Sequence, residues 1–423
     1  MSSTRPGRPL RVAQIVTTLA RGGAQATVMA SADMSEHGID VTVLAGPDRT
    51  DEGSFWDRPQ PRRGTGPVLV EVPNLVRAVS PARDLKALWW LIRWLRTNRP
   101  DVVHTHSSKA GVLGRLAAAI AGIPCAHTVH GWGPLYADVA AGRLIARLVE
   151  RGLARLCAAL VVVGRTDLRR GVAARIGTPL QYWLIRSGVD TDAVGTAADR
   201  TRLRAELDVE DRFVIGMVAR MAHPKDHATL IAAVVEADVA DWTLVLVGDV
   251  PDRAKVERLV ADARVGHRVR FLGQRDDAAV VPLAFDVAVL ASLWEGMPRV
   301  VVEAAAAGVP VIASDVGSIG ELIEPGVSGR LVPAGRVDGL TEALTDVARR
   351  PEHHRAMAAV ARQRAEVFSV QRMRNDLAGL WTGLSRHAVS GRPRRAVRLA
   401  SRSSTRRRGL GVGVAGDKSS GPT

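Results

Sequence analysis

Two kinds of segment alternate along most of the chain. Short runs rich in β-branched residues are followed by longer stretches in which Ala, Leu and Arg recur at helical spacing. The short runs are apolar at successive positions, which indicates strands of a parallel sheet that is covered on both faces. We predict strands at residues 12–18, 41–45, 68–72, 101–106, 125–131, 159–164, 213–220, 242–249, 268–273, 287–292 and 310–315.

This alternation predicts an α/β fold with two Rossmann-like, doubly wound domains. The pattern is interrupted near residues 185–200, where Gly188 lies among polar residues. We therefore expect one domain over residues 1–190 and a second over residues 191–367. Residues 368–385 are predicted to form a last helix. Its apolar positions at helical spacing are Met373, Leu377, Leu380, Trp381 and Leu384.

The length and composition of the chain are those of a globular protein with room for two domains: 423 residues, 46% hydrophobic and 24% charged. No run of apolar residues is long enough to predict a membrane span, and the N-terminus lacks the pattern of a signal peptide. The two cysteines, Cys125 and Cys157, are too few for a disulfide framework. We expect a cytoplasmic protein.

The net charge of +15 is concentrated near the C-terminus. Residues 386–423 hold ten Arg or Lys against one acidic residue, Asp417, in a Ser- and Gly-rich segment without an apolar period. This composition predicts a disordered basic tail. Such a tail is either a solvated segment without a partner or one that holds the protein near anionic lipid. The rest of the chain lacks interleaved aromatic and basic residues, so we expect no nucleic-acid partner.

A glycine pair follows the first predicted strand. Gly22 and Gly23 lie between that strand and a helix, where backbone amides at the helix N-terminus can bind a phosphate or sugar hydroxyl. The G-x-G-x-x-G spacing is absent, which disfavours a dinucleotide cofactor. A tight structural turn explains the pair equally well.

Two cations follow the first strand of the second domain. Arg220 and Lys225 lie before a helix that is predicted to begin near His227. In open α/β sheets, ligands bind beyond the carboxyl ends of the strands. At that position the two cations can neutralise a diphosphate that gains charge as a leaving group. The alternative is a solvated loop.

Two carboxylates follow the strand at 287–292. Glu295 lies in the loop beside Gly296, and Glu303 lies one or two turns into a helix that is predicted to begin near Pro298. A carboxylate near a helix N-terminus is favoured electrostatically whatever its function. This pair can also accept hydrogen bonds from vicinal hydroxyls, one pair on a sugar and another on a ribose.

Histidines and a D-x-D sequence raise the question of a metal. His104, His106, His127 and His130 lie at two neighbouring strand ends, but no Cys or carboxylate completes a zinc site at a familiar spacing, so we expect no metal. His130 precedes Gly131 at a strand end, where a neutral imidazole can hydrogen-bond a sugar or phosphate. The Asp pair at 190 and 192 lies in the domain join, and we interpret it as a turn or cap.

Taken together, these motifs resemble a known family. From about Arg11 to Leu384 the chain is similar to retaining glycosyltransferases of the GT-B architecture, in family 4, whose two Rossmann-like domains face a central cleft. The motifs, in order, are RGGAQ, PDVVHTHSSKAGVLGRLAA, HTVHGW, IRSGVD, RMAHPKDHATLI, LVGD, FLG and EGMPRVVVEAAAAGVPVIASDVGS. The two glutamates of the last motif are its most specific feature.

The resemblance implies a role for each candidate. The first domain would bind the acceptor and the second the nucleotide sugar, with Glu303 on the donor ribose and Glu295 on the transferred sugar. Arg220 and Lys225 would hold the diphosphate. His130 of the first domain would be catalytic together with Arg220, Lys225 and Glu295. The remaining donor-binding residues would be Gly22 and Gly23 from the first domain and Gly296, Met297 and Pro298 from the second. The terminal helix would cross back to pack on the first domain.

Two departures from the family pattern leave donor preference open. Ser187 precedes Gly188 where the family often has Asn, and Gly317-Ser318 replaces a common Gly-Gly pair.

The resemblance therefore implies a hexosyltransferase-type enzyme that transfers a sugar to an acceptor hydroxyl with retention. The donor would be a nucleotide-diphosphate sugar, with UDP favoured over GDP, used as co-substrate without cofactor or metal. The acceptor would be a glycan or lipid-linked glycan of the cell surface or of an exopolysaccharide. The alternative is a nucleotide-sugar epimerase of the same fold.

The predicted helix at residues 84–98 carries three tryptophans among basic residues. It is either a surface that meets anionic membrane headgroups at the inner face of the cell membrane or an amphipathic core helix.

Overall fold

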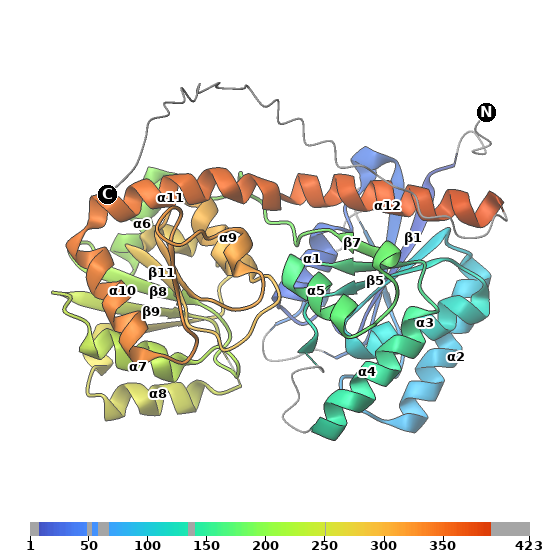
Figure 1. Cartoon of the computed structure of the whole chain (residues 1–423), viewed down its shortest axis with the longest axis horizontal. Helices are drawn as coiled ribbons and strands as arrows, with labels where there is room; N and C mark the ends of the chain where they lie inside the picture. The colour runs from blue at the N-terminus through green and yellow to red at the C-terminus, as the bar shows by residue number, and fades with distance from the viewer. Residues whose placement is uncertain (1–7, 49–52, 58–66, 134–139, 250, 391–423) are drawn as a thin grey trace, which may run out of the picture.

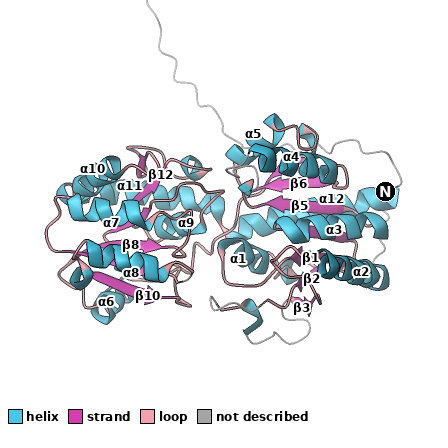
Figure 2. Ribbon diagram, turned by 90° about the horizontal axis from the view of Figure 1, so that it is seen from below, coloured by secondary structure: helices cyan, strands magenta, loops and turns pink. Residues whose placement is uncertain are grey.

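The protein folds into two α/β domains that lie side by side (Figure 1). The computed structural model describes residues 8–48, 53–57, 67–133, 140–249 and 251–390. Each domain has one parallel β-sheet with helices on both faces, which is clearest when the sheets are seen edge-on between their helices (Figure 2). The predicted two-domain α/β fold is confirmed.

The first domain is built on a seven-stranded sheet in the order β3-β2-β1-β4-β5-β6-β7. Its strands are β1 (Leu10–Val16), β2 (Ile39–Ala45), β3 (Val68–Glu71), β4 (Val102–His106), β5 (Cys125–Val129), β6 (Ala159–Val162) and β7 (Tyr182–Leu184). Its helices are α1 (Gly23–Ala30), α2 (Pro81–Asn98), α3 (Ser108–Ala121), α4 (Ala140–Ala154) and α5 (Arg165–Ala173). Every residue of β4, β5 and β6 is buried, as expected for central parallel strands covered on both faces.

The second domain is built on a six-stranded sheet in the order β10-β9-β8-β11-β12-β13. Its strands are β8 (Phe213–Val218), β9 (Trp242–Val247), β10 (Val269–Gly273), β11 (Val287–Leu290), β12 (Val311–Ser314) and β13 (Arg330–Val332). Its helices are α6 (Ala197–Glu206), α7 (His227–Glu236), α8 (Arg253–Asp262), α9 (Arg299–Ala306), α10 (Val337–Arg349) and α11 (Pro351–Ala365). Helix α10 shows why these segments are helical, because Leu340, Ala343, Leu344 and Val347 form one buried stripe at helical spacing.

The last helix, α12 (Val370–Ser390), returns across the molecule to the first domain (Figure 1). Its start is held at the domain join, where the amide of Val189 donates to the carbonyl of Phe368 at 2.9 Å and the amide of Val370 donates to the carbonyl of Val189 at 2.8 Å. Its apolar residues Met373, Leu377, Leu380 and Trp381 are buried in the core between α12 and one face of the first sheet. The crossing implied by the family resemblance is therefore confirmed.

Some elements differ from those predicted. All eleven predicted strands are present, and two further strands, β7 and β13, lie at sheet edges. Helix α12 continues to Ser390, five residues past the predicted end at 385, because residues 386–390 contain no Gly or Pro and Gly391 follows them. The remainder of the predicted tail, residues 391–423, lies outside the described residues. The predicted boundary at residue 190 lies between β7 and β8, the last and first strands of the two sheets.

Among the described residues, no helix is both long enough and apolar enough to cross a membrane.

We expect Trp381 to contribute more to the stability of the first domain than any other residue of α12. Its side chain is fully buried, and replacing a buried Trp with Ala costs about 3–5 kcal/mol of unfolding free energy. We expect W381A to lose that amount in chemical denaturation followed by circular dichroism. Trp89 is 62% exposed, so W89A is the matched control, with a loss of about 0.5 kcal/mol or less. Equal losses in the two variants would contradict the assigned packing of α12.

Candidate active site

A cleft of about 500 Å³ lies where the carboxyl ends of the strands of both sheets meet. The loops after β1 and β5 line it from the first domain, and the loops after β8, β9, β10 and β11 line it from the second. The residues predicted for the site all line this one cleft: Gly22, Gly23, His130, Arg220, Lys225, Glu295, Gly296, Met297, Pro298 and Glu303.

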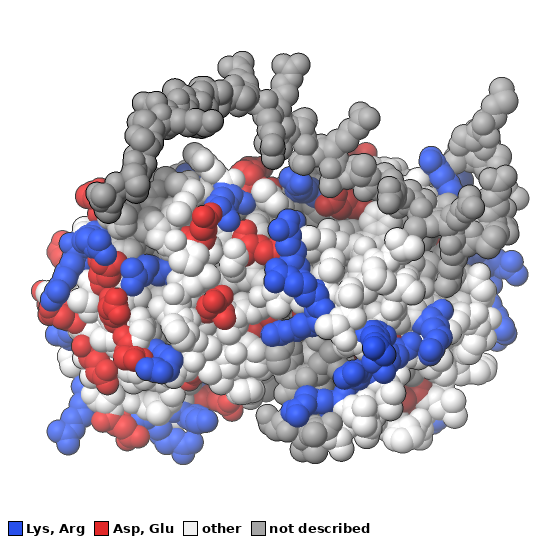
Figure 3. All heavy atoms as spheres, viewed as in Figure 1, with Lys and Arg blue, Asp and Glu red and all other residues white. Residues whose placement is uncertain are grey.

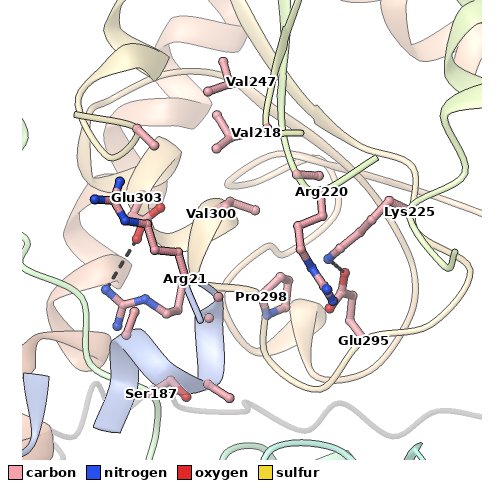
Figure 4. A pocket seen from close by; sticks show the side chains of 18 of the residues that line it. Arg21, Ser187, Val218, Arg220, Lys225, Val247, Glu295, Pro298, Val300 and Glu303 are labelled. Carbon is pink, nitrogen blue, oxygen red and sulfur yellow. Dashed lines mark hydrogen bonds and ion pairs between the residues drawn. The ribbon is translucent and has the colours of Figure 1, made fainter. Parts of the chain in front are cut away.

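One end of the cleft gathers two cations around a carboxylate. The ammonium of Lys225 is paired with Glu295, and the hydroxyl of Ser292 donates to Oε1 of Glu295 at 2.8 Å. The side chains of Lys225 and Glu295 are only 18% and 13% exposed. The side chain of Arg220 points toward the same carboxylate (Figure 4). A polyanionic ligand entering here would compete with Glu295 for these cations.

The loop that carries the two cations is fixed by the helix that follows it. Asp226 caps α7, since its Oδ1 accepts from the amide of Thr229 at 3.2 Å. The amide of Lys225 donates to the carbonyl of Ala222 at 2.8 Å. The side chain of Lys225 therefore projects from a closed turn at the end of β8, which reduces the entropy lost when it holds a ligand.

Glu303 lies at the other side of the cleft (Figure 4). It lies in the second turn of α9, with Oε1 3.5 Å from a guanidinium nitrogen of Arg299. Burial raises the pKa of the Glu303 carboxyl, and the charge of Arg299 offsets part of that increase. The side chain of Glu303 is only 12% exposed and lines the cleft. Two vicinal hydroxyls of a ligand in the cleft would donate to its carboxylate oxygens.

The two domains meet closely beside Glu295. A Cβ added at Gly296 would lie 2.6 Å from the carbonyl oxygen of His130, closer than such atoms approach. Gly317 has a φ of +60°, and a Cβ there would lie 2.3 Å from the carbonyl oxygen of Glu295. Glycine at these positions thus lets three loops converge. Gly296, predicted as a donor-binding residue, has a structural reason to be glycine that is independent of any ligand.

On the first domain, the glycine pair begins helix α1 and faces the cleft. Gly22 is the N-cap, and α1 has neither a capping side chain nor an acidic residue in its first turn. Its first amides therefore remain available to an anion or hydroxyl from the cleft. Neither glycine has a positive φ, which weakens the alternative that the pair serves only a strained turn.

His130 and three other histidines lie close together but form no metal centre. The described residues contain no group of His, Cys, Asp or Glu that could hold a metal ion. The D-x-D pair forms a turn, because Oδ1 of Asp190 accepts from the amides of Asp192 and Ala193 at 3.2 Å each. Our interpretation of that pair as a turn is confirmed.

Sequence reasoning missed several residues that line the cleft. Arg21 forms a 2.5 Å ion pair with Asp276, which joins the two domains across the cleft, and it lies on the same side as Glu303 (Figure 4). The other missed residues include Val218, Val247, Asp249, Gln274, Arg275 and Val300. Most of them lie at or just after the ends of β8, β9 and β10, so their positions beyond strand ends were the available signal.

Two Rossmann-like domains that face a central cleft are the arrangement of the GT-B fold. The structure of Anabaena HepE in complex with UDP-glucose has the same fold, with a TM-score of 0.76 and 21% identity over 88% of this chain and 100% of that chain. The sequence-family model of the glycosyl transferase 4-like domain matches residues 21–181. The family model of the glycosyl transferases group 1 matches residues 199–364.

Two relatives agree with these matches. The chain is 32% identical over 284 residues to the UDP-Gal:alpha-D-GlcNAc-diphosphoundecaprenol alpha-1,3-galactosyltransferase of Escherichia coli, covering 65% of this chain and 73% of the relative. It is 30% identical over 294 residues to the alpha-maltose-1-phosphate synthase of Mycolicibacterium smegmatis, covering 63% and 75%. The chain belongs to the group 1 glycosyltransferases and is a glycosyltransferase of GT-B type.

The burial of His104 lets us predict how the free energy of unfolding changes with pH. Burial lowers the pKa of His104 to about 3, whereas in the unfolded chain it lies near about 6.5. As the pH falls below about 6.5, the unfolded chain therefore gains a proton that the folded protein does not bind, and His104 contributes a loss of up to about 1.4 kcal/mol per pH unit. We expect the unfolding free energy of H104Q to fall less steeply than that of the wild type between about pH 7 and about pH 5.

His267 is exposed on the second domain, which makes H267Q the control variant. Urea unfolding at several pH values measures all three proteins. Parallel slopes for H104Q and the wild type would show that His104 is not held neutral.

Proposed function

We propose that the protein transfers a sugar from a UDP-sugar to a hydroxyl of a lipid-linked glycan, with retention at the anomeric carbon and without metal or cofactor. The observation that carries this proposal is the placement of Arg220, Lys225 and Glu295 at one side of a single cleft and of Glu303 at the other. Cations at one side would face the diphosphate, and carboxylates at both sides would face hydroxyls. This arrangement suits a nucleoside diphosphate that carries a sugar.

The donor would lie along the second-domain wall. Arg220 and Lys225 would bind the diphosphate, and Glu303 would accept from the two ribose hydroxyls. Val218, Val247 and Val300 line the cleft between these groups and would provide an apolar surface for the nucleoside (Figure 4). Once the diphosphate competes for Lys225, Glu295 would be released to accept from hydroxyls of the transferred sugar.

In the transfer step, the bond between the anomeric carbon and the diphosphate oxygen breaks while the acceptor oxygen bonds to the same face of that carbon. The acceptor proton passes to the departing diphosphate, whose growing charge Arg220 and Lys225 would stabilise. These two cations take the part that a metal ion has in other phosphate chemistry. Retention is supported by the likeness to family 4 enzymes, and the assignment of UDP by the relatives and neighbours whose names include it.

A lipid-linked acceptor is supported by the Escherichia coli relative, whose name includes alpha-D-GlcNAc-diphosphoundecaprenol. Such a lipid stays in the membrane, so the enzyme would work at the inner membrane face. The helix predicted to meet the membrane, α2, exposes only one of its three tryptophans, Trp89. Trp90 and Trp94 pack against the core between α2, α3 and the sheet.

Helix α4 offers a more suitable membrane surface. Four of its aliphatic side chains are 45–63% exposed: Leu144, Ile145, Leu148 and Val149. Its inner side is held near its end by the buried Leu153 and Ala154 and by an ion pair, in which Glu150 accepts from both terminal guanidinium nitrogens of the buried Arg115 at 2.8 and 3.0 Å. In an ordinary surface helix the apolar stripe faces the core. The exposed stripe of α4 faces outward instead, which indicates that it contacts a partner.

The charge around α4 favours an anionic bilayer as that partner. Arg143 and Arg147 are exposed on the same helix. In the space-filling view, Lys and Arg side chains form a band over the face where Figure 1 draws α4, with few acidic side chains among them (Figure 3). Exposed aliphatic and basic groups together are typical of helices that lie in the lipid interface. An enzyme attached through α4 would stay at the membrane that holds a lipid-linked acceptor.

Replacing Glu303 tests the donor assignment. E303A should bind UDP about ten- to a hundredfold more weakly in isothermal titration calorimetry, the effect of losing hydrogen bonds to a charged group. Glu342, 81% exposed on α10, provides the control variant E342A, which should bind UDP like the wild type. Unchanged UDP affinity in E303A would contradict the assignment.

The reaction is tested by incubating the wild type with a panel of UDP- and GDP-sugars and a lipid-diphosphate sugar acceptor. We expect a new glycosidic bond whose ¹H coupling constant reports the donor's anomeric configuration. An inverted linkage would contradict retention. Isomerised nucleotide sugar without acceptor would identify an epimerase instead.

Vesicle sedimentation tests the α4 surface. The wild type should bind vesicles of phosphatidylcholine with phosphatidylglycerol and bind phosphatidylcholine alone weakly, while the double variant I145E/L148E should lose most of that binding. Leu180, 74% exposed elsewhere in the first domain, gives the control L180E. The same comparison in protein lacking residues 391–423 separates the helix from the tail. Equal binding by I145E/L148E and L180E in the shortened protein would rule α4 out.

A further inference from the structure

Three histidine rings connect the cleft to helix α12, and we call His104, His106 and His130 the histidine column. His104 and His106 are two residues apart on β4, so they share one face of the sheet, the face on which α12 packs. Their ring centroids are 4.4 Å apart, and those of His106 and His130 are 5.5 Å apart. At the far end, Nε1 of Trp381 donates to Nδ1 of His104 at 3.1 Å.

The hydrogen bonds of His104 define its tautomer. An indole nitrogen can only donate, so Nδ1 of His104 must be the unprotonated acceptor for Trp381. The proton of the neutral ring therefore lies on Nε2, which donates to Oγ1 of Thr128 at 2.7 Å. Burial keeps this ring neutral by lowering its pKa. His104 is thus locked by two partners and gives His106 a fixed ring to stack on.

The contact between His106 and His130 also has one favoured arrangement. Nδ1 of His106 and Nε2 of His130 are 3.2 Å apart, so one nitrogen donates and the other accepts. Nε2 of His106 is buried without a hydrogen-bond partner among the described residues. If His130 were the donor, the proton of His106 would lie on this buried Nε2 and be left without an acceptor. Buried N–H groups without an acceptor are rarer in proteins than buried acceptors without a donor, which favours His106 as the donor.

We propose that His106 is a positioning residue that holds His130 in the tautomer with its proton on Nδ1, and that His130 presents this N–H to the donor in the cleft. With Nε2 occupied as the acceptor for His106, Nδ1 is the ring nitrogen left to a ligand, and His130 lines the cleft. The identity of that ligand, a sugar or diphosphate group, rests on the proposed function. The orientation of the imidazole does not.

The histidine column also explains why Trp381 of α12 reaches the first sheet. Trp381 is fully buried and meets the ring of His104 edge-on, at 79° and 5.7 Å. Helix α12 therefore fixes His104, His104 supports His106, and His106 orients His130. The placement of a cleft residue thus depends on packing by a helix that begins at the domain join.

The tautomer can be measured directly in the full-length protein labelled with ¹⁵N-histidine. Long-range ¹H–¹⁵N spectra distinguish protonated from unprotonated ring nitrogens, and the signals missing from H130A assign His130. We expect a protonated Nδ1 and an unprotonated Nε2 in the wild type, and a loss of that preference in H106F. A wild-type His130 that carries its proton on Nε2 would overturn the proposal, whether or not the protein transfers sugar.

Kinetics test the consequence. H106F keeps a ring to stack on His104 but lacks the N–H, whereas the side-chain amide of H106N can restore a donor near the position of Nδ1. With UDP release from UDP-galactose or UDP-glucose as the readout, kcat should fall about tenfold or more in H106F and recover in H106N. UDP affinity and thermal unfolding, measured in parallel, should stay close to the wild type in H106N.

Wild-type kcat in H106F, or equal losses in H106F and H106N, would overturn the positioning role. If the wild type releases UDP from neither sugar nucleotide with the lipid-diphosphate sugar acceptor present, neither is its donor, and the NMR measurement decides the role of His106.

Discussion

The backbone of Gly296 lies against the carbonyl of His130, and the two halves of the cleft can face each other only because nothing larger than hydrogen stands between them. Parallel sheets place their ligand-binding loops at one edge. In a two-domain protein, the two edges form one site only if the loops of one domain can approach those of the other. The glycine contact allows this approach, while the return of α12 and the pairing of Val189 with Phe368 hold the domains in register. Catalytic geometry thus depends on packing well outside the cleft.

Without ligand, the charges of the cleft are paired with one another. Lys225 pairs with Glu295, Arg299 with Glu303, and Arg21 with Asp276. Partly buried ions cannot remain unpaired without a large desolvation cost. Of the three, the pairs at Glu295 and Glu303 are the most buried, and the proposed ligand would take the place of the partner ion in each. A nucleoside diphosphate sugar offers both anionic oxygens for the cations and hydroxyl donors for the carboxylates, whereas a simple anion offers only the former. The two carboxylates therefore favour the proposed donor over phosphate alone.

The sequence predicted the fold well because its central strands are apolar on both faces. It missed β7 and β13, which are three residues long, lie at sheet edges and are only partly buried, so they lack that signal. Cleft residues directly after strands were predictable from topology and charge. Arg21 and His106 were not assigned roles, because their roles come from contacts with Asp276 and His130, which only the folded chain brings near.

The central claim is that this cleft binds a nucleoside diphosphate sugar between the Lys225–Glu295 pair and Glu303. A crystal structure of the protein with UDP tests it most directly. The account predicts the diphosphate within hydrogen-bond distance of Arg220 and Lys225, the ribose hydroxyls on Glu303, and the ion pair between Lys225 and Glu295 opened. UDP bound elsewhere, or bound in the cleft with its ribose away from Glu303 and that ion pair intact, would contradict it.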